Sequence, residues 1–255
     1  MLPLRTLGIF LGCLIIALGL CAPWLAPYNP GALHLNDVLS PPSATFWLGT
    51  DALGRDVLSR LLYGTRVSLS VGLVAVGLAI GLGVLVGVMA ALVRKLDAPL
   101  MRATDVMLCF PTIFLILAVI ALLQPSLLNV MIVIGLTGWM GTARLVRAEL
   151  LSLRARPFMD AATLAGVRPA RLAWAHLLPN ALPPILTSAS LGLAGAILTE
   201  AGLSYLGLGV QPPTPSWGAM LAEGKGVMEA AWWLITYPGL AIVITVLSFT
   251  FAAEN

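Results

Sequence analysis

The stretch VSLSVGLVAVGLAIGLGVLVGVMAALV, residues Val67–Val93, contains no charged side chain. A helix needs about 20 predominantly apolar residues to cross the hydrocarbon core of a bilayer, and this stretch is longer than that. The whole chain is 59% hydrophobic and 10% charged, whereas roughly 25% of the residues in soluble domains are charged. The sequence therefore predicts an all-α membrane protein.

The same length criterion predicts five more membrane-spanning helices, which makes six in all. The six stretches are Leu7–Ala26, Val67–Val93, Val106–Leu123, Val130–Leu150, Leu182–Leu203 and Tyr237–Ala253. The fourth has two arginines and a glutamate in its last turns, so we expect its helix to continue out of the membrane. The segments between the spans are too short for a soluble domain, and residues 1–255 are predicted to form a single transmembrane domain.

Arginine and lysine indicate the orientation, because the short cytoplasmic loops of membrane proteins carry an excess of them. With the N-terminus inside, ten of the 14 basic residues fall on the cytoplasmic side and the other four outside. Both termini are therefore predicted to be cytoplasmic, and the N-terminal apolar run is interpreted as an uncleaved first span. The arginines lie in patches with few aromatic side chains between them, so topology explains them better than nucleic-acid binding does.

The first outer segment, residues 27–66, contains TDALGRDVLSRLLYG from Thr50 to Gly64. Thr50 or Asp51 can cap a helix here, and leucines recur at helical spacing on one side of it. Charged and polar residues, among them Arg55 and Arg60, fall on the other side. Two interpretations stay open: a helix that lies in the plane of the membrane interface, and a scaffold helix packed under a loop.

A second polar stretch, DAATLAGVRPARLAWAHLLPN, runs from Asp160 to Asn180 on the predicted cytoplasmic side. Asp160 suits the start of a short helix, and Gly166 suits its end because glycine accepts left-handed backbone geometry. Pro169 suits the first turn of a second helix, which Pro179 ends. The first helix presents small methyl groups, which either seat in a groove on a partner or pack against the protein's own bundle.

This stretch resembles the EAA loop of the membrane subunits of ATP-binding-cassette (ABC) importers. The matching positions are Asp160, Ala161, Ala162, Gly166, His176, Leu178 and Pro179, with Asp160 in place of the family's glutamate. Two further stretches, Phe46–Gly72 and Glu200–Leu221, are similar to segments of peptide and nickel importer permeases. The chain is thereby identified as a member of the dipeptide/oligopeptide/nickel permease family, and it resembles the second permease of that group.

The resemblance implies a type I ABC-importer permease fold with a cytoplasmic coupling helix, in the inner membrane of a bacterium. It implies as partners a sister permease, two cytoplasmic ATPases, an external substrate-binding protein and the membrane lipid. ATP and Mg²⁺ would be bound by the ATPases, and no cofactor is expected in this chain. The residues expected to couple the chain to an ATPase are Asp160, Ala161, Ala162, Leu164, Gly166 and Pro169.

No enzyme activity is expected of the chain itself. A nucleotide-binding P-loop needs the pattern G-x-x-x-x-G-K-[ST], and neither of the two lysines, Lys95 and Lys225, fits it. The sequence also shows no Ser/His/Asp set and no spacing of cysteines and histidines that indicates a metal site. Uphill transport by this chain would therefore take its energy from a separate subunit.

The function implied is peptide import through a route that this chain shares with its sister permease. Import of nickel, of a metal chelate or of glutathione is the alternative within the family, and a secondary transporter or a scaffold without transport is the alternative outside it. Glu200, Ser204 and Trp217 are candidates for the route or its outer gate. Glu200 has a second interpretation, as a structural residue paired with a backbone group or with Arg66.

Overall fold

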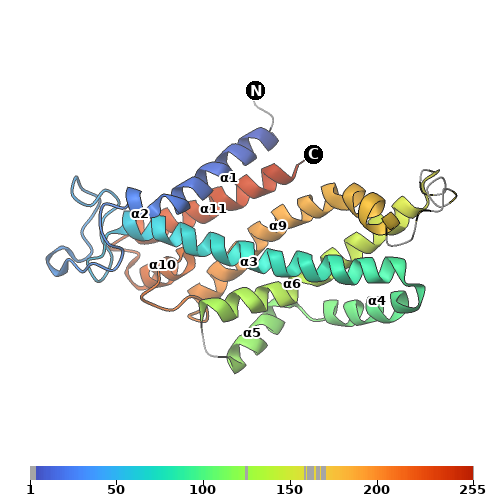
Figure 1. Ribbon diagram of the computed structural model, residues 1–255. Helices are drawn as coiled ribbons and strands as arrows, with labels where there is room; N and C mark the ends of the chain where they lie inside the picture. Colours follow the sequence, from blue (N-terminus) through green and yellow to red (C-terminus); the bar gives the residue numbers. More distant parts are fainter. Residues whose placement is uncertain are drawn as a thin grey trace.

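The computed structural model describes residues 4–123, 126–157, 159, 164, 167 and 171–254. The molecule is long and narrow, and its longest helices run along its length (Figure 1). They are α3 (Val57–Leu92), α6 (Leu127–Arg154), α9 (Leu178–Tyr205) and α11 (Trp233–Ala253). One end, which we call the loop end, carries residues 26–56 and the short helix α10 (Trp217–Gly224). The other, the hairpin end, carries the turn between α3 and α4 (Arg94–Leu108).

In the part of the chain that the structure describes, four helices are long and apolar enough to cross a membrane. They are α3, α6, α11 and the stretch Trp174–Tyr205, which includes α9. A fifth crossing results if α4 and α5 (Thr112–Leu122) together form one bent span. Helix α1 (Leu4–Leu20) is apolar but has only 17 residues. The structure thus bears out an all-helical membrane protein, and the number of six spans stays a prediction.

The third predicted span, Val106–Leu123, is not one continuous helix. Helix α4 ends at Leu108, and α5 begins at Thr112 with its axis bent by 83° from that of α4. Pro111 explains the break, because proline lacks a backbone N–H and disfavours helical geometry at the residue before it. A criterion based on apolar composition cannot detect this bend, since the residues on both sides of it are apolar.

Close contact between α3 and α6 depends on glycine. A Cβ atom on Gly83 would lie 2.5 Å from the Cβ of Thr142, and one on Gly87 would lie 2.7 Å from the carbonyl oxygen of Ala143. The absence of side chains on this face of α3 lets the two backbones approach, as is common between membrane helices. Near the hairpin end, Arg154 of α6 adds a hydrogen bond from Nη1 to the carbonyl oxygen of Ala91, at 2.7 Å.

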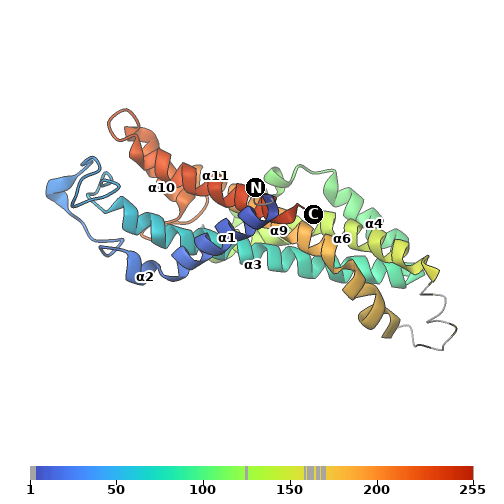
Figure 2. The same ribbon diagram turned by 90° about the horizontal axis from the view of Figure 1, so that it is seen from above.

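Helices α1 and α11 lie side by side in both views (Figures 1 and 2), so the two termini are neighbours. Gly8 of α1 allows this approach, because a Cβ there would lie 2.5 Å from the backbone nitrogen of Ala252. The pair packs on the long bundle through a cluster that includes Ile15, Leu69 and Ile242.

The separate helix expected to begin at Thr50 does not form, which corrects the prediction for the first outer segment. Helix α3 begins at Val57, and its cap is Asp56, whose carboxylate accepts a hydrogen bond from the backbone N–H of Ser59 at 2.7 Å. The chain before it is a tight turn around Asp51, with Gly54 at a φ of +72°. A side chain at position 54 would meet the carbonyl oxygen of His34 at 2.1 Å, so the turn requires glycine.

Candidate functional site

A cavity of about 720 Å³ lies between α3, α5, α6 and α9. Six of the described residues that line it carry hydroxyl groups: Thr112, Thr137, Thr142, Thr187, Ser188 and Thr199. Most of the others are glycine, alanine or branched aliphatic residues, and none of the described lining residues is ionisable. The wall can therefore offer hydrogen bonds to a polar solute without imposing a charge on it.

The cavity was not predicted from the sequence, although a signal for it exists. Two glycine pairs, Gly138 and Gly141 on α6 and Gly192 and Gly195 on α9, have the three-residue spacing that places small residues on one helix face. Nothing lies within 4 Å of a Cβ atom built on Gly141 or Gly195. Gly141 and Gly195 thus leave open space between helices, whereas Gly83 and Gly87 allow helices to touch.

An apolar cluster closes the cavity toward the loop end. Ile116, Ile134 and Ala196 line the cavity and also belong to this cluster. The cluster continues along each helix in the direction of the loop end, with Val71, Ile120, Val130 and Leu203. Leu208, which follows the end of α9, is partly buried and packs against this cluster. The cavity itself extends the other way, to Ile80, Leu145 and Pro184. We call the cluster with Leu208 the closure, since it separates the cavity from the loop end.

Glu200 follows the cavity residue Thr199 but points away from the cavity. Its side chain is fully buried, and it accepts hydrogen bonds from the hydroxyls of three serines. The distances are 3.2 Å from Ser68, 2.7 Å from Ser204 and 2.9 Å from Ser216. The partners of Glu200 are therefore serine hydroxyls, and neither a backbone group nor Arg66 is among those that the structure shows for it.

The three residues predicted for the route or its gate thus come together in one place. Glu200, Ser204 and Trp217 are 0%, 4% and 1% exposed, and they lie where α9, α10 and α3 meet. None of them is among the residues that line the cavity. Their contribution to transport stays a prediction, and it would have to act through the position of the loop-end segments.

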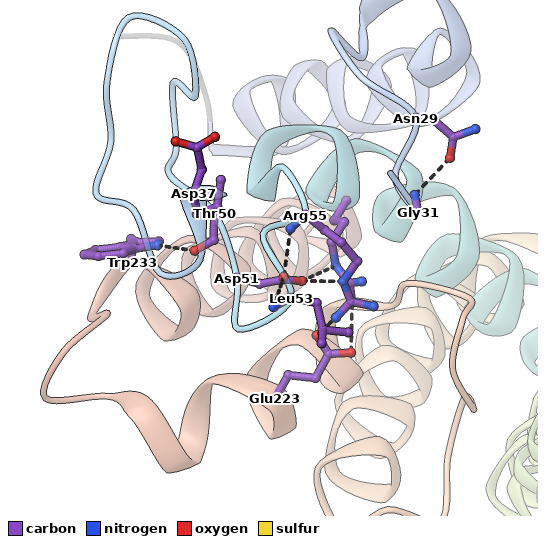
Figure 3. Close-up of polar contacts among 10 residues, drawn as sticks. Asn29, Gly31, Asp37, Thr50, Asp51, Leu53, Arg55, Glu223 and Trp233 are labelled. Carbon is purple, nitrogen blue, oxygen red and sulfur yellow. Dashed lines mark hydrogen bonds and ion pairs between the residues drawn. The ribbon is translucent and has the colours of Figure 1, made fainter. Parts of the chain in front are cut away.

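The loop end is held together by buried charges. Arg55 lies between two carboxylates, those of Asp51 at 2.6 Å and Glu223 at 2.8 Å (Figure 3). Arg60 also donates to Glu223, so this one side chain of α10 binds two arginines, one before α3 and one in its first turn. Trp233, at the start of α11, donates from its indole nitrogen to the carbonyl oxygen of Thr50 at 3.1 Å (Figure 3). Arg55 and Arg60 are therefore structural residues of the loop end and do not form the polar face of an interfacial helix.

At the hairpin end, only one of the six predicted coupling residues is described. Leu164 is 89% exposed, so its side chain is free to contact a partner. Val167 nearby packs against a buried cluster that includes Leu150, Leu153 and Leu172. The other coupling residues lie outside the described part of the chain: Asp160, Ala161, Ala162, Gly166 and Pro169.

Comparison with known proteins now identifies the family. The family model described as "binding-protein-dependent transport system inner membrane component" matches residues 83–254. The chain belongs to this permease family. The match includes the EAA-like stretch and the helices α5, α6 and α9 around the cavity, and it confirms the membership that Asp160–Asn180 indicated.

Curated relatives match almost the whole permease. The "Di/tripeptide transport system permease protein DppC" of Pseudomonas aeruginosa (strain UCBPP-PA14) is 41% identical over 255 residues, which cover 97% of this chain and 84% of the relative. The "Dipeptide transport system permease protein DppC" of Escherichia coli (strain K12) is 40% identical and is covered to 85%. The protein of the same name from Alkalihalophilus pseudofirmus is 38% identical over 99% of this chain.

Among solved structures, the permease is similar to a chain of the MetNI methionine ABC transporter in an inward-facing conformation. The TM-score is 0.65, and the match covers 76% of this chain and 93% of the other. Because the sequences are only 20% identical, this similarity concerns the fold alone. It confirms the type I importer permease fold, and together with the family match it establishes a multi-pass transport subunit of the membrane.

Proposed function

We propose that this permease forms one half of the route by which an ATP-driven importer carries peptides across a bacterial inner membrane. The observation that carries the proposal is the hydroxyl-lined, uncharged cavity between α3, α5, α6 and α9 in a chain about 40% identical to dipeptide permeases. A peptide presents amide groups that hydrogen-bond to hydroxyls, and its side chains vary in charge. A wall without fixed charges neither attracts nor repels a peptide according to the sign of its charge, so it does not select among these side chains.

Import of nickel or glutathione by the same family is the alternative, and the cavity favours it less. Ni²⁺ is bound by imidazole, thiolate or carboxylate groups. The described lining residues include none of these. A chelated metal needs no ligand from the protein, so the experiment below includes nickel as a separate substrate.

In the proposed arrangement the loop end is extracytoplasmic and the hairpin end is cytoplasmic, with both termini in the cytoplasm. An external binding protein delivers the peptide at the loop end, and a sister permease supplies the other half of the route. At the hairpin end the segment 160–169 docks on one of two ATPases, which bind ATP and Mg²⁺. Shifting a helix bundle with two conformations from a population ratio of 1:99 to 99:1 takes about 5.5 kcal/mol of free energy. The docked segment therefore has to transmit a free-energy difference of that size from the ATPase to the bundle. The exposed Leu164 supports a docking role for this segment.

The experiment is transport by the complete importer in proteoliposomes, with the sister permease, both ATPases and the binding protein. We would measure ATP-dependent uptake of labelled dipeptides with net charges of −1, 0 and +1, and uptake of Ni²⁺. Two variants of a lining residue, Ser188→Asp and its uncharged counterpart Ser188→Asn, test whether the cavity is the route.

The proposal predicts peptide uptake by the parent and no uptake of free Ni²⁺. Ser188→Asp should reduce uptake of the anionic peptide by about tenfold or more relative to the cationic one, since two like charges a few ångströms apart repel by more than 1 kcal/mol at low dielectric. Ser188→Asn should change all three rates by a similar small factor. Equal effects of Ser188→Asp on the anionic and cationic peptides would show that substrate does not pass this wall.

A further inference from the structure

The serines that donate to Glu200 also hold the segment that joins α9 to α10. Ser204 accepts a hydrogen bond from the backbone N–H of Val210 at 3.0 Å, and Ser68 accepts one from that of Trp217 at 3.3 Å. Ser216 caps α10 by accepting from the backbone N–H of Ala219 at 3.2 Å. Each serine hydroxyl therefore donates a hydrogen bond to Glu200 and accepts one from a backbone N–H. Through these serines, both ends of the segment 205–217 are connected to the Glu200 side chain.

Glycines let this segment approach α9 closely enough for those bonds. A Cβ atom on Gly209 would lie 2.0 Å from the Ser204 hydroxyl oxygen, and one on Gly218 would lie 2.6 Å from the Cα of Ala201. The segment at Gly209 and the start of α10 at Gly218 are therefore both in close contact with α9. Trp217 adds a hydrogen bond from its indole nitrogen to the carbonyl oxygen of Leu61 on α3, at 3.3 Å.

The same segment supplies part of the closure. Leu208 lies between Ser204 and Val210, and it packs against the apolar cluster that includes Leu203, Ile120 and Val130. Its backbone N–H donates to the carbonyl oxygen of Leu203 at 2.9 Å. The position of Leu208 in the closure thus depends on the segment that the serines hold, although neither Leu208 nor Glu200 is among the described residues that line the cavity.

We infer that Glu200 is the positioning residue of the extracytoplasmic gate: it holds the segment 205–217, and with it Leu208, across the outer end of the cavity. This inference rests on the proposed function, since it takes the loop end as extracytoplasmic and the cavity as the transport route. A fully buried carboxylate with three hydroxyl donors is satisfied while the segment stays in place. Ser68 and Ser204 stay on α3 and α9 when the segment moves, but the carboxylate would lose its donor Ser216 in a buried site, and this cost favours the closed gate.

The role requires hydrogen-bond acceptance more than charge, which makes glutamine and alanine different tests. In Glu200→Gln the amide oxygen can still accept from Ser204 and Ser216, as the carboxylate oxygen Oε1 does. Glu200→Ala removes all three acceptor contacts and leaves the serines to other partners. Glutamine fills the same volume as glutamate, whereas alanine also leaves a cavity. Ser216→Ala separates the two effects, because it removes a donor to Glu200 with little change of volume.

The experiment measures access to the gate in the assembled importer. A single cysteine replaces Leu208 in a parent whose Cys13, Cys21 and Cys109 are changed to serine, and a membrane-impermeant maleimide is added from the extracytoplasmic side. The labelling rate is compared among the parent, Glu200→Ala, Glu200→Gln and the control Gly202→Ala. Gly202 suits the control because it is an exposed α9 residue with nothing within 4 Å of an added Cβ. ATPase activity without binding protein is measured in a second set of complexes, which carry the same substitutions but retain Leu208.

We expect Glu200→Ala to raise the labelling rate about tenfold, the population shift that corresponds to loss of one or two buried hydrogen bonds. It should also raise ATPase activity without binding protein, because a weaker closure shifts the two-state bundle toward the outward-open state that ATP binding favours. Glu200→Gln should stay within about threefold of the parent, since it keeps two of the three acceptor contacts. Gly202→Ala should label like the parent.

Labelling of assembled Glu200→Ala at the parental rate would overturn the inference, as would equal labelling of the alanine and glutamine variants. If Glu200→Ala does not assemble, Ser216→Ala decides, because it removes one donor to Glu200 together with the cap of α10. Faster labelling of Ser216→Ala supports the inference, and an unchanged rate refutes it. Neither readout uses a peptide, so failure of peptide uptake and failure of the gate are separate results.

Discussion

Arg60, in the first turn of α3, is 2% exposed and donates through Nη2 to both carboxylate oxygens of Glu223 on α10, at 2.9 and 2.8 Å. The two residues are far apart in the sequence, and their contact fastens α10 to the start of the longest helix. Because Glu223 also binds Arg55, it balances buried positive charge from two places. Glu223 and Asp51 together therefore balance the charge of the two arginines at the loop end.

Glu223→Ala should destabilise the assembled importer. Removal of one partner from a buried ion pair costs about 3–5 kcal/mol, and since the Glu223 side chain is 29% exposed we expect a smaller loss, of about 1–3 kcal/mol. The measurement is the apparent melting temperature of the purified complex, which should fall by several degrees. Glu229→Ala, at an exposed glutamate of the same end, is the control and should leave the melting temperature unchanged.

Gly87→Ala should disturb the packing of α3 on α6. The added methyl group would lie 2.7 Å from the carbonyl oxygen of Ala143 and 2.8 Å from the Cβ of Val146, so the helices must move apart, at a cost of about 1–3 kcal/mol. Gly81→Ala is the matched control on the same helix, because nothing lies within 4 Å of its Cβ position. We would compare the yield and melting temperature of the two complexes. Equal behaviour would mean that the contact between α3 and α6 is not close in the assembled protein.

Leu164→Asp should weaken binding of the ATPase. An exposed leucine that enters a groove on a partner contributes through apolar burial, and placing a carboxylate there should lower co-purification of the ATPase by about tenfold or more. The control is Arg156→Gln, at an exposed residue of the same end of the molecule. Unchanged co-purification of Leu164→Asp, with normal transport, would argue that this leucine faces lipid or solvent in the complex.

Gly166→Val should uncouple transport from ATP hydrolysis. The prediction comes from the sequence, because Gly166 follows the expected coupling helix where glycine allows a left-handed turn, and a β-branched residue disfavours that geometry. Peptide uptake should fall at least tenfold, about 1.4 kcal/mol of lost coupling, while the ATPases still co-purify. Gly226→Val at the loop end, where a Cβ meets nothing within 4 Å, is the control. Normal uptake by Gly166→Val would remove the support for a fixed angle after the coupling helix.

Apolar runs predicted where long apolar helices form, because suitability for lipid depends on local composition, while the number of six spans stays a prediction. The predicted fourth and sixth spans lie within α6 and α11, and the predicted second span lies within α3 except for its last residue, Val93. The EAA-like stretch predicted the family for a similar reason, since all of its matching positions lie between Asp160 and Pro179. Helix boundaries were less predictable. The turn around Asp51 delays the start of α3 to Val57, where helical spacing predicted a start at Thr50 or Asp51. The bend at Pro111 divides the apolar run Val106–Leu123, so that α5 begins at Thr112.

By itself, the sequence determined that this chain is a helical membrane protein of the ABC-importer permease family, because both conclusions depend on residues close together in the chain. Only the tertiary structure decided which faces meet. It brought Ser68, Ser204 and Ser216 to Glu200, joined Arg60 to Glu223, and left a hydroxyl-lined cavity between four helices. Helices that are apolar on all sides carry no periodic signal for their buried face, so their packing is set by how glycines and side-chain volumes fit across the bundle.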